Sequence, residues 1–147
     1  MANRSIDTFL PYLLSRASHL VSRRFYALLK RQGMPIREWR VLGTLFDGDG
    51  VPLGELAEIC LIEQSTATRL IDRMAARGLV EKKVDGDDRR RALVCITPAG
   101  RSAASGLMEQ AREIDRAIVA GFDPKRRAQL KAELEALIAV MEAEGGR

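Results

Sequence analysis

We predict a mainly α-helical fold with a small β-wing, and three observations support this prediction. Apolar residues recur at three- and four-residue spacing in both terminal thirds of the chain, a pattern typical of amphipathic helices. Two short helical segments near the middle are separated by a tight turn, which predicts a helix-turn-helix. Two short apolar runs on either side of a turn-forming stretch then predict a β-hairpin. This order indicates a winged helix-turn-helix core flanked by helices from both ends of the chain.

Two helices are expected in the N-terminal part of the chain. The first covers residues 5–30, and Pro11 lies early enough to bend or restart its first turn. Gly33 and Pro35 end this helix, because glycine can adopt the left-handed conformation at a helix end and proline cannot continue the hydrogen-bond ladder. A second helix is expected at residues 36–46.

The helix-turn-helix follows a turn at residues 47–50 and the dipeptide Val51-Pro52, which is too short for more than an edge strand. A two-turn helix is expected at residues 53–60 and a longer helix at residues 63–77. The periodicity of the longer helix directs one set of side chains inward and another outward. The inward set is Ala67, Leu70, Ile71 and Met74, and the outward set is Ser65, Thr66, Thr68, Arg69, Asp72 and Arg73.

Gly78 ends that helix, and two strands are expected after it. Residues 79–84 pair with residues 92–96 across a tip at residues 85–91. Thr97-Pro98 is a typical helix start, with threonine as the N-cap and proline in the first helical position. A helix is therefore expected from residue 98 to about residue 120.

A final helix is expected to start at Asp123-Pro124, which repeats the cap-then-proline pattern, and residues 144–147 are expected to fray. The terminal helices carry more apolar surface than a small core can cover, so we expect a two-fold dimer in which they pack across subunits. The helical dimerisation region is then residues 1–34 and 98–147, and the winged helix-turn-helix domain is residues 35–97. The apolar stripe of the helix after residue 98 is expected to comprise Ala103, Leu107, Ala111, Ile114 and Ile118.

Composition limits the classes of partner. The 147 residues carry a net charge of +4, a mild basic excess that suits a polyanion. Aromatic residues make up only 5% of the chain, which argues against a protein that reads single-stranded nucleic acid by stacking. There is one histidine, and we find neither paired carboxylates in a predicted cleft nor a Gly-rich phosphate loop, so an enzyme is not expected.

Cellular context and cofactors follow from what the sequence lacks. Cys60 and Cys95 are far apart and have neither a CxxC neighbour nor a nearby histidine, so no zinc site or other cofactor is expected. We find no signal peptide and no apolar run approaching the ~18 residues of a membrane span. The expectation is a cytoplasmic protein with two reduced thiols and no membrane partner.

The outward face of the helix at residues 63–77 has the chemistry of a DNA-reading surface. Ser65, Thr66 and Thr68 lie near its N-terminal end, where the helix dipole favours phosphate. Gln64 and Arg69 can reach adenine and guanine edges. Arg73 extends the same face, and Lys82 and Lys83 in the following strand are candidates for phosphate contacts. A solvated face on an ordinary surface helix remains the alternative.

The hairpin tip concentrates cations. Arg89, Arg90 and Arg91 alternate at the start of a strand, so they cannot all point the same way. An arginine is permanently charged and weakly hydrated, which suits the negative minor groove, and Asp88 could hold the guanidinium in position. The alternative is a solvated turn in which aspartates and arginines neutralise one another.

With these residues in place, the chain resembles the MarR family of transcriptional regulators over most of its length. The resemblance assigns Arg90 to the minor-groove contact and Asp88 to its support, with Arg89 and Arg91 on phosphate or in solvent. Pro35 and Ile96 depart from the family pattern without disturbing a helix start or a buried strand end. The residues that carry the resemblance are Gly33, Trp39-Arg40-Val41-Leu42, Leu56-Ala57, residues 64–74, Arg77-Gly78-Leu79-Val80, Asp88-Arg89-Arg90 and Ile96-Thr97-Pro98-Ala99-Gly100.

The resemblance also implies an effector site. Members of the family bind small aromatic or anionic ligands between the dimerisation helices and the DNA-binding lobe, and the candidates here are Tyr12, Arg16, His19, Trp39 and Arg40. Each also has a purely structural interpretation: Trp39 in the core, the arginines solvated or salt-bridged, and His19 at the surface or an interface. Redox-sensing members use a cysteine in the N-terminal helix, and residues 1–59 contain none. Cys60 is expected in the helix-turn-helix core and Cys95 in the wing strand.

The functional expectation is a homodimeric regulator, expected to be a repressor, that binds a pseudo-palindromic double-stranded operator and is released by a small aromatic or anionic effector. The alternative is a helical dimerisation module whose winged lobe binds protein rather than DNA. Salt-dependent binding to random duplex distinguishes the two.

Overall fold

The computed structural model describes residues 5–48, 50–84 and 92–145, and over these residues the predicted fold class is confirmed. The chain divides into two compact units, Met1–Ala111 and Arg112–Arg147, with the boundary inside α5. The proposed division into dimerisation and DNA-binding regions concerns roles rather than compactness and stays a prediction. The elements in chain order are η1 (Ser5–Thr8), α1 (Leu10–Arg31), α2 (Ile36–Leu45), β1 (Val51–Pro52), α3 (Leu53–Ile59), α4 (Gln64–Ala76), β2 (Val80–Val84), β3 (Ala92–Ile96), α5 (Pro98–Ile118) and α6 (Pro124–Gly145).

The N-terminal helix is not continuous from residue 5. A short 3-10 helix, η1, precedes α1, and α1 begins at Leu10 with Pro11 in its first turn. Proline is tolerated there because its missing N–H would have had no acceptor within the helix. At the other end Gly33 has a φ of +65°, as expected for a residue that reverses the chain after a helix. Because α1 begins at Leu10, with Pro11 in its first turn, the predicted restart of the helix at Pro11 is confirmed.

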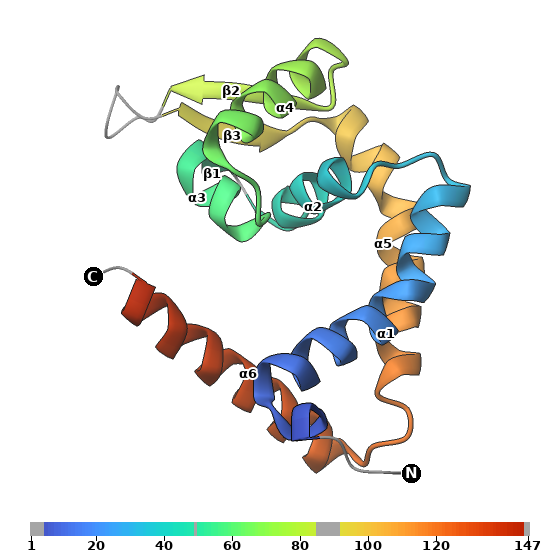
Figure 1. Ribbon diagram of the computed structural model, residues 1–147. Coiled ribbons are helices and arrows are strands. Elements are labelled where there is room, and N and C mark those ends of the chain that lie inside the picture. The colour runs from blue at the N-terminus through green and yellow to red at the C-terminus, as the bar shows by residue number, and fades with distance from the viewer. Residues whose placement is uncertain (1–4, 49, 85–91, 146–147) are drawn as a thin grey trace. The chain divides into compact units, whose positions relative to one another are not determined.

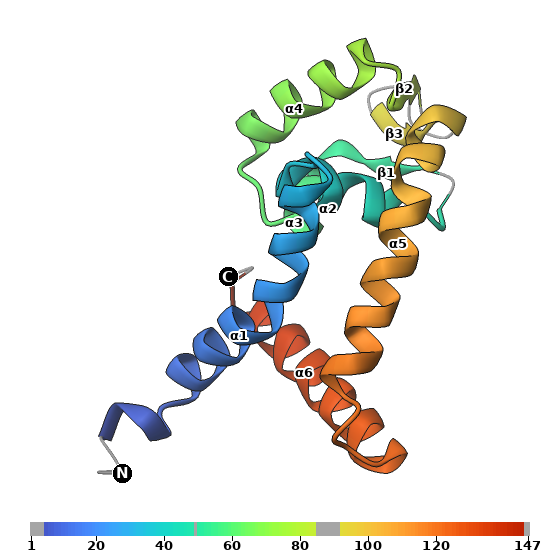
Figure 2. The ribbon, with the colours of Figure 1, turned by 90° about the vertical axis from the view of Figure 1, so that its right-hand side faces the viewer.

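The core of the first unit lies between α2, α3, α4 and the small sheet. Each element contributes the apolar side chains of one face, and Figure 2 shows α4 lying above α2 and α3. The inward set predicted for α4 is fully buried, which confirms the rotation of this helix. The buried cluster comprises Val41, Leu42, Leu45, Leu56, Cys60, Leu70, Ile71, Met74, Val80, Val94 and Ala104.

The sheet has the strand order β1-β3-β2, and both pairs are antiparallel (Figure 1). Among the described strands, Val51–Pro52 pairs with β3 alone and is therefore an edge strand, as predicted. In the hairpin, Val80 lies opposite Ile96 and Val84 lies opposite Ala92. Val80 and Val94 face the core, whereas Glu81 and Lys83 lie on the opposite side of β2.

A close backbone approach joins the hairpin to α5. The predicted N-cap is confirmed, because the backbone N–H of Gly100 donates to Thr97 Oγ1 at 3.0 Å and Thr97 Oγ1 donates to the Gly78 carbonyl at 2.5 Å. The backbone N–H of Thr97 also donates to the carbonyl of Leu79 at 3.2 Å. A Cβ at position 100 would collide with the Leu79 carbonyl oxygen and lie 2.9 Å from its carbon. Only glycine allows the chain to pass here.

This contact also corrects the predicted face of α5. Gly100, Ala104 and Leu107 are the buried residues of the helix, and Ala103 is exposed. Because Gly100 must face Leu79, the helix is rotated so that Ala104 rather than Ala103 continues the inward stripe. Leu107 keeps its predicted inward place, and Ala111, Ile114 and Ile118 are half-buried.

The second unit contains the end of α5 and α6. Asp123 caps α6 as predicted, since its Oδ1 accepts from the backbone N–H of Arg126 at 2.9 Å. Two boundaries differ from the prediction: α5 ends at Ile118, and α6 continues to Gly145, so Glu144 is helical rather than frayed. None of the described residues of α6 is buried. Within the described ranges, no helix is long and apolar enough to cross a membrane.

Replacing Gly100 with alanine should destabilise the fold by about 1 to 3 kcal/mol or more, because the new methyl group overpacks a backbone carbonyl that cannot move independently. Urea unfolding followed by circular dichroism measures the change. Gly106→Ala on the same helix is the matched control: nothing lies within 4 Å of a Cβ there, so this variant should be at least as stable as the parent. Equal stability of the two variants would contradict the close approach.

Candidate nucleic-acid interface

The exposed face of α4 is defined by its buried opposite face. Burial of Ala67, Leu70, Ile71 and Met74 leaves the predicted outward set on the other side of the helix. Gln64, Ser65, Arg69 and Arg73 are exposed, whereas Thr66 and Thr68 are half-buried. The structure therefore brings the predicted base-reading side chains onto one accessible surface.

Two polar side chains at the start of α4 bond to their own helix. Thr68 Oγ1 donates to the Gln64 carbonyl at 3.1 Å, and Arg69 Nε donates to the Ser65 carbonyl at 3.4 Å. The Thr68 hydroxyl has one proton, so in this rotamer it can accept a hydrogen bond but cannot donate to a phosphate. The hydrogen bond of Arg69 uses Nε, so the two terminal nitrogens of its guanidinium, which are the ones that bind guanine, do not take part in it.

Both lysines of β2 form surface ion pairs that were not predicted. Lys82 Nζ lies 2.5 Å from Asp72 Oδ1 on α4, and Lys83 Nζ lies 2.8 Å from Glu81 Oε1. The hydrogen bond from Lys83 to Glu81, followed by the charge of that carboxylate, raises the pKa of Lys83. Exposed pairs of this kind contribute little free energy, so a phosphate can displace either carboxylate at little cost.

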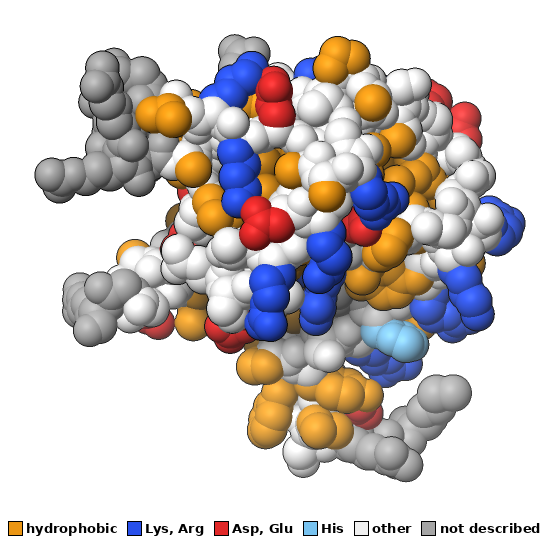
Figure 3. All heavy atoms as spheres, turned by 90° about the horizontal axis from the view of Figure 1, so that it is seen from above, with side chains coloured by type: hydrophobic (Ala, Val, Ile, Leu, Met, Phe, Trp, Pro, Cys, Tyr) orange, Lys and Arg blue, Asp and Glu red, His pale blue; other side chains and the backbone are white. Residues whose placement is uncertain are grey.

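The face of the molecule that carries α4 and the hairpin is mixed in charge. Figure 3 looks down on it from above and shows Lys and Arg side chains spread across the surface with Asp and Glu among them. Glu81-x-Lys83 was readable in the sequence, because residues two apart share a face of a strand. The Lys82–Asp72 pair joins two elements and had no local signal.

The predicted wing-tip residues Asp88, Arg89, Arg90 and Arg91 lie outside the described residues. They belong to the connection between Val84 and Ala92, which are the last paired residues of β2 and β3. Their assignment to the minor groove and to phosphate therefore stays a prediction.

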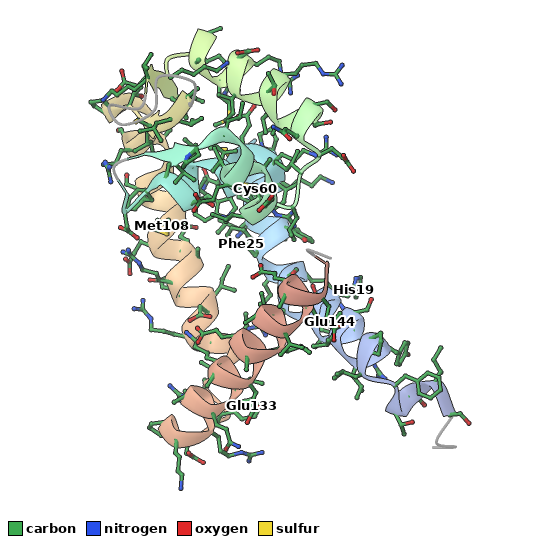
Figure 4. All side chains as sticks on the ribbon, turned by 90° about the vertical axis from the view of Figure 1, so that its left-hand side faces the viewer. His19, Phe25, Cys60, Met108, Glu133 and Glu144 are labelled. Atoms are coloured by element: carbon green, nitrogen blue, oxygen red, sulfur yellow. The ribbon has the colours of Figure 1, made fainter. Side chains whose placement is uncertain are left out.

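The predicted effector residues come from two helices, α1 and α2, and their role stays a prediction. Tyr12 is half-buried and Arg16 and His19 are exposed on α1. Among the residues that the structure describes, no hydrogen bond, ion pair or ring contact joins these three side chains to Trp39 or Arg40. Figure 4 shows His19 on α1, whereas Phe25 lies nearer the end of that helix that meets α2.

Trp39 and Arg40 have structural contacts within the fold. Trp39 is half-buried rather than part of the fully buried core, and its ring packs against Phe25 with the ring centroids 5.2 Å apart. Arg40 is half-buried, and its Nη1 donates to the Cys60 carbonyl at 3.1 Å, so it binds the C-terminal end of α3 rather than a carboxylate. This hydrogen bond satisfies a carbonyl that the helix cannot satisfy itself.

Two hollows on the surface lie elsewhere. One of about 270 Å³ is lined by Tyr26, Leu29, Lys30, Met34 and Ile36, where α1 ends and α2 begins. The other, of about 410 Å³, lies between α3 and α4. Its lining is Gly54, Ala57, Glu58, Leu61, Ile62, Glu63 and Gln64. Neither lining includes a predicted effector residue.

The two cysteines take the places predicted for them. Cys60 belongs to the buried helix-turn-helix core, where Thr44 Oγ1 lies 3.7 Å from its sulfur, and burial raises the pKa of its thiol (Figure 4). Cys95 is buried in β3 beside Gly50. A raised pKa lowers the thiolate fraction, so Cys60 is a poor nucleophile at neutral pH.

The ion pair between Glu38 of α2 and Arg77 at the end of α4 was not predicted from the sequence. Glu38 is the buried charged residue among the described residues, and its Oε1 accepts from Arg77 Nη1 at 2.7 Å. Its neighbours in sequence gave no sign of this, because the partner lies at the far end of α4. The contact ties α2 to the helix that carries the candidate DNA-reading face.

A family model and solved structures of similar sequence both match this chain to one family. A sequence model of the MarR family matches residues 32–91. The MarR-family transcriptional regulator SPO1453 from Silicibacter pomeroyi is 34% identical, with a TM-score of 0.83 and coverage of 95% of this chain and 99% of that one. BpsR of Bordetella bronchiseptica, whose DNA binding is regulated by 6-hydroxynicotinic acid, is 25% identical with a TM-score of 0.76, covering 92% and 97% of the two chains.

Curated relatives agree with this result. The homoprotocatechuate degradative operon repressor of Escherichia coli is 26% identical over 127 residues, which is 86% of each chain. The transcriptional regulator TtmR of Methylorubrum extorquens is 26% identical over 67% of this chain, and the match spans about half of that protein. From the helix-turn-helix with its wing, the polar outer face of α4 and these similarities, it follows that the chain belongs to the MarR family of transcriptional regulators.

Proposed function

We propose that the protein is a sequence-specific repressor that binds double-stranded DNA as a homodimer on a pseudo-palindromic operator. The observation that carries the proposal is the polar outer face of α4, which is held outward by a completely buried inner face. In a helix-turn-helix the second helix enters the major groove, so Gln64, Ser65 and Arg69 would meet base edges and phosphates. The arginine-rich connection after β2 would reach the flanking minor groove.

Exposed apolar side chains support the homodimer. Phe9, the N-cap residue of α1, is 60% exposed, Leu10 in α1 is 53% exposed, and Ile138 in α6 is 55% exposed. Exposed apolar side chains gathered on one helix often mark an interaction surface, and most oligomers of soluble proteins are symmetric. A two-fold dimer would place two copies of α4 on one face of a duplex, with half-site centres about 10 bp apart.

The sign of regulation and the effector are proposed from relatives. The Escherichia coli relative is a repressor of a degradative operon, and 6-hydroxynicotinic acid, an aromatic acid, regulates DNA binding by BpsR. We infer a small aromatic or anionic effector here, which releases DNA by favouring a dimer form that no longer matches successive major grooves. It can shift that equilibrium only by its difference in affinity for the two forms.

Arg90→Ala should weaken operator binding by about 1 to 3 kcal/mol and relax base preference at the flanking positions, because it removes the minor-groove contact. Arg91→Ala is the matched control, since loss of a phosphate contact weakens all duplexes alike. Titration of both variants against operator and random duplex measures the difference. Parent-like operator binding by Arg90→Ala would rule out the proposed role of the wing.

Lys83→Gln should weaken binding to operator and random duplex alike and flatten the slope of log K against log salt by about 0.9, the value for one lost phosphate contact. Lys131→Gln on α6 is the control, because Lys131 also sits beside a carboxylate, Asp115 at 3.7 Å, but outside the proposed DNA face. Affinity measured at several salt concentrations gives both slopes. An unchanged slope for Lys83→Gln would exclude this lysine from the interface with DNA. If the DNA affinity of the parent protein did not depend on salt, the alternative of a wing that binds protein would be favoured instead.

An aromatic acid that acts as effector should raise the melting temperature of the parent and weaken its operator binding at the same concentration, because it binds the folded dimer and shifts its form. A thermal-shift panel of hydroxylated benzoic, phenylacetic and nicotinic acids tests this. Arg16→Met and Arg40→Met report whether either predicted arginine takes part. No shift with any acid in the panel would count against the effector site.

A further inference from the structure

Three consecutive residues of α2 contact three different helices. Glu38 bonds to Arg77 at the end of α4, Trp39 packs against Phe25 of α1, and Arg40 bonds to the Cys60 carbonyl at the end of α3. Successive residues of a helix point about 100° apart, so one turn of α2 can face all three neighbours at once. This turn therefore links α1 to both helices of the helix-turn-helix.

The Glu38–Arg77 pair is one-sided. The Glu38 side chain is 9% exposed and the Arg77 side chain is 57% exposed. Glu38 Oε1 lies 2.7 Å from Arg77 Nη1, but within the described part of the chain Oε2 has no hydrogen-bond partner. Burying a carboxylate with one oxygen unsatisfied costs free energy, and a single pair seldom repays that cost. A gain in stability is therefore a poor explanation for this glutamate.

The place where Glu38 contacts α4 suggests another role for this glutamate. Arg77 is the C-cap of α4, and Gly78 follows with a φ of +71°, so the helix ends and the chain turns toward β2 at this point. A buried ion pair can specify one arrangement among several of similar stability, because only one of them lets the charges meet. Here the charges meet only when the end of α4 lies against α2.

We propose that Glu38 is a positioning residue for DNA recognition, which acts through Arg77 to fix the angle of α4 against the rest of the lobe. The inference rests on the proposed function, since it assumes that α4 reads a duplex. Base readout requires several side chains to reach the groove together, whereas binding to phosphates of any sequence tolerates small rotations. Loss of the pair should therefore lower sequence specificity more than it lowers affinity for random DNA.

The competing explanation is that Arg77 itself contacts phosphate, with Glu38 as a neutralising neighbour. That explanation predicts the opposite effect on random DNA. Removing the negative charge of Glu38 would release the guanidinium and tighten binding to every duplex, with a steeper salt dependence.

Glu38→Gln tests the proposal, because glutamine has nearly the same shape and lacks the charge. We expect its affinity for the duplex that the parent selects from a random pool to fall about tenfold, the effect of losing about one base contact. Its affinity for random duplex should stay within about twofold. Its midpoint of urea unfolding should equal or exceed that of the parent.

Variants of Arg77 complete the test. Arg77→Met should reproduce the loss of specificity, Arg77→Lys should restore most of it, and the Glu38→Gln/Arg77→Met double variant should be no worse than either single variant. Glu133→Gln, an exposed carboxylate on α6, is the control and should bind both duplexes like the parent.

Three results would overturn the inference: an unchanged specificity ratio in Glu38→Gln, an equal loss on both duplexes together with a lower unfolding midpoint, or tighter binding to random duplex. The rescue by Arg77→Lys separates positioning from a general loss of stability. If the parent protein binds no duplex, the proposed function is refuted, and the inference with it. If the parent binds its selected duplex and Glu38→Gln binds with the same affinity and specificity, the inference alone is refuted.

Discussion

Burial of the apolar face of α4 sets the rotation of this helix, and with it the candidate DNA-reading face. Ile71 and Met74 are completely buried with Leu42 and Leu45 of α2, and no other rotation of the helix buries this apolar stripe. Because the inner face is fixed, Ser65, Arg69 and Arg73 are held outward. The rotation that exposes the candidate DNA-reading surface is thus a consequence of core packing.

The root of the wing is fixed by backbone contacts rather than by side-chain packing. Thr97 connects the hairpin to α5 through three hydrogen bonds, two of its hydroxyl and one of its amide. Gly100 allows the Leu79 carbonyl to approach the first turn of α5 more closely than any other residue would. The strands that lead to residues 85–91 therefore start from a fixed point, which is what a contact with a neighbouring groove would require.

Much of the fold could be predicted because local signals agree with the long-range packing. Pro11, Gly33, Thr97-Pro98 and Asp123-Pro124 mark helix ends by mechanisms that act within a few residues, and each end lies where it was predicted or within two residues of it. The inward face of α4 followed from helical periodicity alone. The face of α5 was misjudged by one residue because its rotation depends on Leu79, whose position the local pattern does not reveal.

The candidate site was less predictable. Glu38, Arg40 and Lys82 have partners on other elements, and the periodicity of one element cannot predict such partners. The hydrogen bond from Arg40 to the end of α3 and the packing of Trp39 on Phe25, outside the fully buried core, had no signal in the local sequence. Exposed residues such as Ser65 and Arg73 were easier to assign, because a side chain that faces away from the core keeps its chemistry available.

We propose that two copies of α4 read successive major grooves of a duplex. Selection of bound duplexes from a random pool by the purified protein, followed by sequencing, tests this proposal. The selected pool should be enriched in an inverted repeat with half-site centres about 10 bp apart and A·T-rich flanks where the wings would lie. Recovery of a pool with no enriched motif, or of a single unrepeated half-site, would contradict it.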